Sequence, residues 1–144
     1  MTTPICFYSS YLFLINSIIL YLNNDYIYSY LFKYLTITSL LFHSERDNYK
    51  NAYYYRKIDF VMILCLFMYA NYYTYNKISK KIHISLRDFL CLFIILLTII
   101  LVGILHFYGR FIQDYCYHPD YFINEYYHSM LHLSFFICHL FIFL

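Results

Sequence analysis

Apolar residues occur along this chain in five long runs, separated by short clusters of polar and charged residues. The runs cover residues 5–22, 26–42, 58–75, 89–108 and 121–144. A run of about 20 apolar residues is long enough to cross the hydrocarbon core of a bilayer as a helix. None of the runs alternates apolar and polar residues as a barrel strand does, and backbone groups in lipid need partners within their own segment. The pattern therefore predicts about five transmembrane helices.

The segments between the runs are expected to lie at the membrane surface. The longest, residues 43–57, contains six charged residues, and a charged side chain within hydrocarbon costs several kcal/mol, so this segment is expected to be a loop in water. The segment 76–88, on the opposite side, carries four Lys or Arg residues, as many as 43–57. The positive-inside rule therefore leaves the orientation of the chain open.

The composition agrees with a membrane protein and excludes several other classes. Of the 144 residues, 62% are hydrophobic and only 12% are charged, which excludes an ordinary soluble domain. The length fits a single transmembrane domain over residues 1–144, an all-α helical bundle. The net charge of +2 provides no basic surface of the kind that nucleic acid requires, so nucleic acid is not an expected partner.

A few ionisable side chains lie inside or at the edges of the runs, where their cost makes them candidates for function. His43 ends the second run, Asp59 begins the third, and His128 and His132 lie early in the fifth. Successive membrane helices cross in alternate directions. All four side chains are therefore expected on one side of the membrane and at a similar depth.

The spacing of these residues is typical of a zinc site. Residues four apart lie on one face of a helix, so His128 and His132 can reach one ion, and His43 adds a third imidazole. The fourth tetrahedral position of zinc then stays open for water, whose pKa falls toward about 7, and such water can attack an amide or ester. Asp59 is expected to hold or deprotonate this water. Ser39, one turn before His43, is expected to hydrogen-bond a ligand, the water or the developing oxyanion.

The same residues carry a resemblance to a known family. Ser39-Leu-Leu-Phe-His43, Asp59 and His128-Ser-Met-Leu-His132 resemble the SxxxH, Asp and HxxxH motifs of the CREST superfamily, which includes alkaline ceramidases, progestin and adipoQ receptors and enzymes that remodel GPI-anchor lipids. The resemblance implies that the three histidines bind zinc, with Asp59 and Ser39 around the water. It also implies a lipid amide or ester substrate, such as a sphingolipid, and an endomembrane (ER- or Golgi-like) or other cellular membrane. The family has seven helices, so five helices leave out two walls of its lipid pocket.

Other residues and functions stay open at this point. His106 ends the fourth run on the same side and competes for a ligand position. His139, seven residues beyond His132 and about 10 Å deeper, is expected to pack or to line a pocket. Glu125 is expected to be a solvated acid, with contact to a ligand histidine as the alternative. The leading function is a zinc-dependent lipid hydrolase. The alternatives are a non-catalytic receptor-like or lipid-binding protein that retains the metal site, and a small structural membrane protein.

Overall fold

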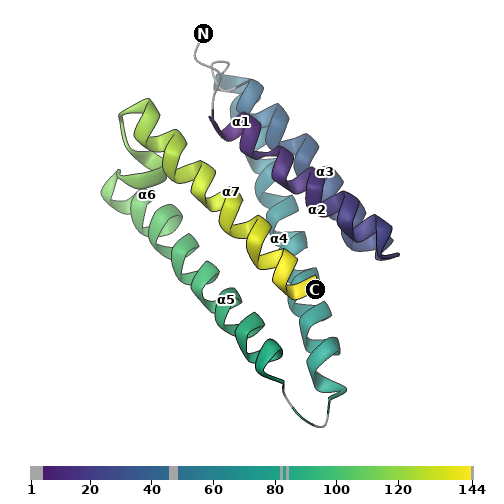
Figure 1. Cartoon of the computed structure of the whole chain (residues 1–144). Coiled ribbons are helices and arrows are strands. Elements are labelled where there is room, and N and C mark those ends of the chain that lie inside the picture. Colours follow the sequence, from purple (N-terminus) through teal and green to yellow (C-terminus); the bar gives the residue numbers. More distant parts are fainter. Residues whose placement is uncertain (1–4, 46–48, 82, 84, 144) are drawn as a thin grey trace. The chain divides into compact units, whose positions relative to one another are not determined.

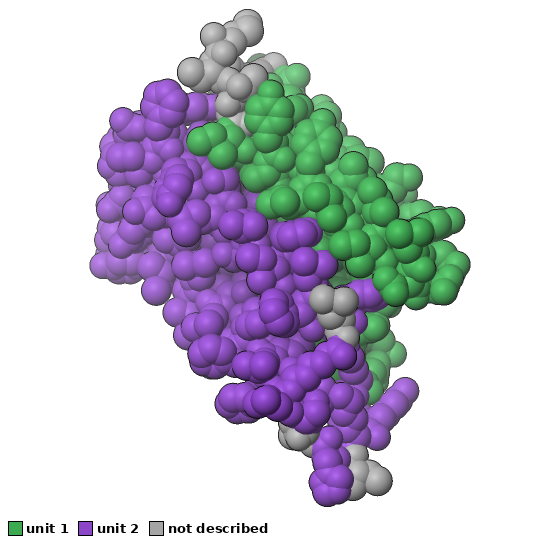
Figure 2. Space-filling model, viewed as in Figure 1, with its two compact units in different colours: residues 1–76 green, residues 77–144 purple. Residues whose placement is uncertain are grey.

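The computed structural model of the chain describes residues 5–45, 49–81, 83 and 85–143, and every regular element in these ranges is a helix. This confirms the all-α fold class. The chain divides into two compact units, residues 1–76 and 77–144 (Figure 2). In the described ranges, four helical segments are long and apolar enough to cross a membrane: Ile5–Leu22, Lys50–Ser79, Leu86–Ile112 and Tyr121–Phe143.

The first unit begins with a helical hairpin. Its first arm consists of α1 (Ile5–Ser9) and α2 (Tyr11–Leu22), and its second arm is α3 (Tyr26–Ser44). Asn24, at φ 65°, is in the left-handed region that reverses the chain. The Asp25 carboxylate then accepts a hydrogen bond from the Tyr28 backbone N–H at 3.3 Å, which caps the first turn of α3.

Small polar side chains join the two arms of the hairpin along their whole length. Near the turn, the Ser17 hydroxyl donates to the Ser29 carbonyl at 2.9 Å, and the Ser29 hydroxyl donates to the Ser17 carbonyl at 2.7 Å. At the far end, the hydroxyls of Ser10 and Ser39 are 2.9 Å apart. Serine lets membrane helices approach closely, and its hydroxyl finds a partner on the neighbouring helix. The two arms are therefore antiparallel neighbours from one end to the other (Figure 1).

Helix α4 (Tyr49–Ser79) is longer than the apolar run that predicted it. The stretch 43–57 was expected to be a loop, but the chain is helical from Tyr49, and the loop prediction is wrong for this part. Lys50, Arg56 and Lys57 are all exposed on the helix surface. Hydropathy therefore shows where an apolar segment ends, whereas a helix continues into water as long as its charged side chains point outward. Arg46 and Asp47 lie outside the described residues.

The second unit is built around two long helices, α5 (Leu86–Val102) and α7 (Tyr121–Phe143), which pack against each other. Ser85 and Asp88 form a capping box at the start of α5. A π-helical turn (η1, Gly103–Tyr108), the short helix α6 (Gly109–Ile112) and a 3₁₀ turn (η2, Tyr115–Tyr117) connect α5 to α7. The predicted fourth run, 89–108, is covered by α5 and the π-helical turn together, and α7 follows the fifth run, 121–144, closely.

Helix α5 directs large apolar side chains outward. Phe93, Leu96, Leu97 and Ile100 are each between 48% and 54% exposed. A contiguous apolar surface of this kind is rare on proteins in water and ordinary on helices in lipid. The exposed surface of α5 therefore agrees with a membrane-embedded chain.

The connection between α5 and α7 has its own small core, in which Leu105, Cys116 and Leu131 are buried together. The backbone passes close to Gly109, whose carbonyl accepts a hydrogen bond from the Asp114 N–H at 2.9 Å. A Cβ at position 109 would lie 2.8 Å from the Asp114 carbonyl oxygen, closer than two such atoms can approach. Position 109 therefore requires glycine.

We expect Gly109→Ala to lower the free energy of unfolding by about 1–3 kcal/mol, the usual cost of overpacking. The backbone oxygen of Asp114 accepts a hydrogen bond from the Tyr117 N–H at 3.0 Å, which would be lost if the oxygen moved away. Gly103→Ala is the matched control, because no atom apart from its chain neighbours and its own helix backbone lies within 4 Å of a Cβ there, and it should leave stability unchanged or raise it. Denaturation in detergent measures both variants. Equal stability of the two variants would contradict the close approach at Gly109.

Candidate metal centre

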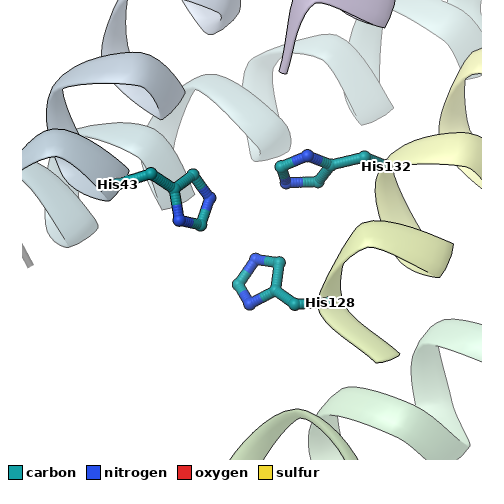
Figure 3. Close-up of side chains that lie close together, drawn as sticks. All are labelled: His43, His128 and His132. Atoms are coloured by element: carbon teal, nitrogen blue, oxygen red, sulfur yellow. The ribbon is translucent and has the colours of Figure 1, made fainter. Parts of the chain in front are cut away.

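The strongest candidate for a metal site in the second unit is a pair of imidazoles on α7. His128 and His132 lie one turn apart, and their ring centroids are 5.2 Å apart in an edge-to-face arrangement. A ring nitrogen of each lies within 4.8 Å of a ring nitrogen of the other. Both side chains leave α7 on the same side (Figure 3). The pair therefore has the i, i+4 geometry that the sequence predicted, which is the spacing at which two imidazoles can share one ion.

His43 is in the last turn of α3, in the first unit (Figure 3). Its ring lies against that of Phe42, with the centroids 4.8 Å apart. The helix continues for one residue beyond it, to Ser44. The imidazole of His43, like those of His128 and His132, can act as a metal ligand. Zinc accepts the lone-pair nitrogen of a neutral imidazole as a ligand.

Asp59 lies in α4, where it is 7% exposed and held by a side chain of α3. The Thr38 hydroxyl donates a hydrogen bond to Oδ1 of Asp59 at 3.0 Å, and its oxygen also lies 3.1 Å from the Leu35 carbonyl oxygen. A buried carboxylate is costly unless it is hydrogen-bonded, and the threonine supplies such a bond. Thr38 was not singled out from the sequence, although it directly precedes Ser39.

Ser39 is fully buried in the hairpin of the first unit, where its hydroxyl lies 2.9 Å from that of Ser10. Ser10 in turn donates to the Cys6 carbonyl at 2.8 Å. Thr38 and Ser39 are about 100° apart around the helix, so one is directed to Asp59 and the other to Ser10. Ser39 therefore has a packing partner that the sequence did not reveal.

Glu125 is not the solvated acid that was expected. It lies within α7, three residues before His128, and only 1% of it is exposed. The preceding polar residues suggested a loop, but α7 begins at Tyr121. The useful signal was helical spacing, because Glu125 shares a face of the helix with His128 and His132.

The two other histidines near the predicted site have local partners. The ring of His106 lies in the π-helical turn, with Nε2 3.1 Å from the Tyr117 hydroxyl. His139 stacks on Phe135, as expected for a packing role, with ring centroids 6.0 Å apart.

Beside Tyr117, burial raises the pKa of the Cys116 thiol to about 12, so this cysteine is a neutral thiol near pH 7.

Comparisons with known proteins do not assign the chain to a family. No protein-family model matches the sequence, and searches of curated proteins and of solved structures also found no match.

Proposed function

We propose that this chain is an integral membrane protein that binds zinc through His43, His128 and His132 and hydrolyses an amide or ester bond of a membrane lipid. The observation that carries the proposal is the pair of imidazoles on consecutive turns of α7, with ring nitrogens within 4.8 Å. Histidine is rare inside membrane helices and is usually retained there for function. Two histidines on one face of one such helix are the core of a metal site.

The order of the helices supports a third ligand from α3. We infer that α3 crosses the membrane with the first apolar segment, because the serine contacts join the two along their whole length. With α4, α5 and α7 this gives five crossings in alternate directions. The end of α3, the start of α4 and the start of α7 then belong to the same membrane side. His43, Asp59 and His128 therefore share that side in this topology.

The donor set fits zinc in type and number. Three neutral imidazoles are a common ligand set of catalytic zinc, and they leave one coordination position open. Zinc bound in this way supplies a Lewis acid and lowers the pKa of water at the open position toward about 7. Both effects promote the hydrolysis of an amide or ester at neutral pH.

The remaining residues of the proposed site transfer the proton and orient the reacting groups. Asp59 is a carboxylate in an apolar helix, and in the proposal it accepts the proton of the attacking water and passes it to the leaving group. Thr38 fixes the orientation of this carboxylate through its hydrogen bond to Oδ1. Ser39 has a hydroxyl that can donate to the developing oxyanion only if its contact with Ser10 opens.

The location of the site favours a lipid substrate. His43 is in the last turn of α3, Asp59 begins the apolar part of α4, and His128 is in the first half of α7, so the proposed site lies toward one membrane surface. An amide or ester bond of a lipid lies at this depth, between the acyl chain and the headgroup. A sphingolipid such as a ceramide is therefore the first substrate to test.

The contact between Ser39 and Ser10 favours a second candidate function. A serine that already pairs with a neighbouring helix is satisfied as a packing residue. The chain would then be a non-catalytic, receptor-like protein that binds zinc and a lipid without hydrolysing it. A measurement of lipid hydrolysis distinguishes the hydrolase from the non-catalytic lipid-binding protein.

Purified, zinc-loaded protein in detergent is expected to release fatty acid from a ceramide or from an ester lipid of similar chain length. Mass spectrometry of the products measures the release. The control is the same protein after removal of zinc by a chelator, which should be inactive and should regain activity when zinc is returned. Zinc-loaded, folded protein that leaves both lipids intact would exclude the hydrolase and favour the binding function.

A further inference from the structure

The turn between α4 and α5 carries a concentration of positive charge within the second unit. Lys77, Lys80, Lys81 and Arg87 are its four basic residues, which we call the basic turn, and Asp88 is its one acid. Four positive charges and one negative charge give a net charge of +3. Asp88 is also the one acid in the whole stretch from Lys77 to Gln113.

Two of the four basic side chains are fixed by contacts with helix ends. The Lys77 ammonium donates to the Ile142 carbonyl at 3.0 Å and so satisfies the C-terminal turn of α7. Lys81 forms an ion pair with Asp88, which also accepts a hydrogen bond from the Ser85 hydroxyl at 2.6 Å. The one acid of the turn is therefore already occupied.

The other two basic side chains, Lys80 and Arg87, are exposed. Within the described part of the chain, neither forms an ion pair. Lys77 and Lys81 are held close by, and Asp88 is already paired with Lys81, so Lys80 and Arg87 lie in a positive potential. An anion is the ligand that such a surface favours.

The residues beside Arg87 indicate what kind of anion this is. Leu86 is 75% exposed and Phe89 is 62% exposed, so large apolar side chains adjoin the positive charge. Apolar side chains at the start of a membrane helix belong in acyl chains, while the charged ends of the long Lys and Arg side chains beside them reach the level of the headgroups. A phospholipid has an anionic phosphate and acyl chains at the matching depths, whereas free phosphate has no apolar part.

The polar segment at the opposite end of α4 differs in charge. Residues 43–59 contain four basic and three acidic residues, a net charge of +1. One of the basic side chains, Lys57, places its ammonium 4.3 Å from the centroid of the Tyr53 ring. The preference for an anion is therefore expected at the basic turn and not at this segment.

We propose that the basic turn binds the phosphate-bearing headgroup of an anionic phospholipid, with Lys80 and Arg87 as its main contacts. Each Lys or Arg near an anionic membrane surface strengthens binding by about fivefold, the fold-change that corresponds to about 1 kcal/mol. Anionic phospholipids are concentrated in the cytoplasmic leaflet, so this contact also favours one orientation of the chain. The inference depends neither on the proposed zinc site nor on hydrolysis.

Native mass spectrometry of the full chain, released from maltoside micelles, tests the proposal with two lipids of equal chain length. Dioleoyl phosphatidylglycerol is expected to bind more tightly than dioleoyl phosphatidylcholine, and Lys80→Gln with Arg87→Gln should weaken its binding by about fivefold per charge removed. The exchange Lys80→Arg with Arg87→Lys keeps both charges and should keep the preference. Lys50→Gln with Lys57→Gln is the matched control at the other end of α4 and should also keep it.

Three results would overturn the proposal. Equal affinity for the two lipids would mean that the contact does not recognise an anion. Displacement of phosphatidylglycerol by inorganic phosphate at equal concentration would identify a free anion as the ligand. An equal loss in the control variant would mean that total charge, and not the basic turn, determines the preference. A melting temperature like that of the wild type shows that each variant is folded.

Discussion

Asp59→Asn is expected to reduce lipid hydrolysis by about 10²–10⁴-fold, the usual contribution of a general base, while the protein stays folded. Asparagine keeps a side-chain oxygen that can accept the hydrogen bond from Thr38, now 3.0 Å from Oδ1. It has no negative charge and cannot accept a proton from water. The variant therefore separates the role of Asp59 in catalysis from its role in joining α3 and α4. Rates of fatty-acid release, measured at equal zinc content, give the effect.

Asp25→Asn is the matched control for this variant. Asp25 lies at the other end of α3, where it caps the helix, and asparagine is also a good N-cap. Its substitution should leave the rate of hydrolysis unchanged. If Asp59→Asn hydrolysed lipid as fast as the wild type, Asp59 would be only a structural partner of Thr38.

Zinc is expected to stabilise the protein strongly, and the double substitution His128→Ala with His132→Ala should abolish this effect. A ligand that binds only the folded state adds about 2.7 kcal/mol to the free energy of unfolding at 100 times its dissociation constant. Both ring nitrogens needed for the α7 half of the site are lost in the variant. Melting curves in detergent, recorded with added zinc and with a chelator, measure the difference.

The control for this prediction removes two histidines that lie elsewhere. His83 is exposed before α5, and His118 is in the loop before α7, where its Nδ1 accepts the Asp120 N–H at 2.9 Å. His83→Ala with His118→Ala should keep the stabilisation by zinc. A loss of the zinc effect in the control, or its persistence in the α7 variant, would place the ion elsewhere.

Most of the fold could be predicted from hydrophobicity alone. The run 26–42 became α3 (Tyr26–Ser44), and the run 121–144 became α7 (Tyr121–Phe143), with Leu144 outside the described residues. In both cases a capping residue or polar cluster adjoins the apolar run, so the ends of the run and of the helix nearly coincide. At α4 they do not, because charged residues from Lys50 to Lys57 extend the helix beyond its apolar part.

The site could be predicted in part, and the limit is the rotation of each helix about its axis. The i, i+4 spacing of His128 and His132 determines that they share a face whatever the helix packs against. For Thr38 and Ser39 no spacing decides which hydroxyl meets Asp59, because neighbouring residues differ by about 100° in direction. Only the packing of α3 directs Thr38 toward Asp59 and Ser39 toward Ser10.

The zinc content of the purified protein tests the central claim most directly. Elemental analysis of the folded wild-type chain is expected to find one zinc ion per chain. The variant in which His43, His128 and His132 are all replaced by alanine should contain none. Folded wild-type protein without zinc after purification in zinc-containing buffer, or a triple variant that retains the ion, would contradict the account.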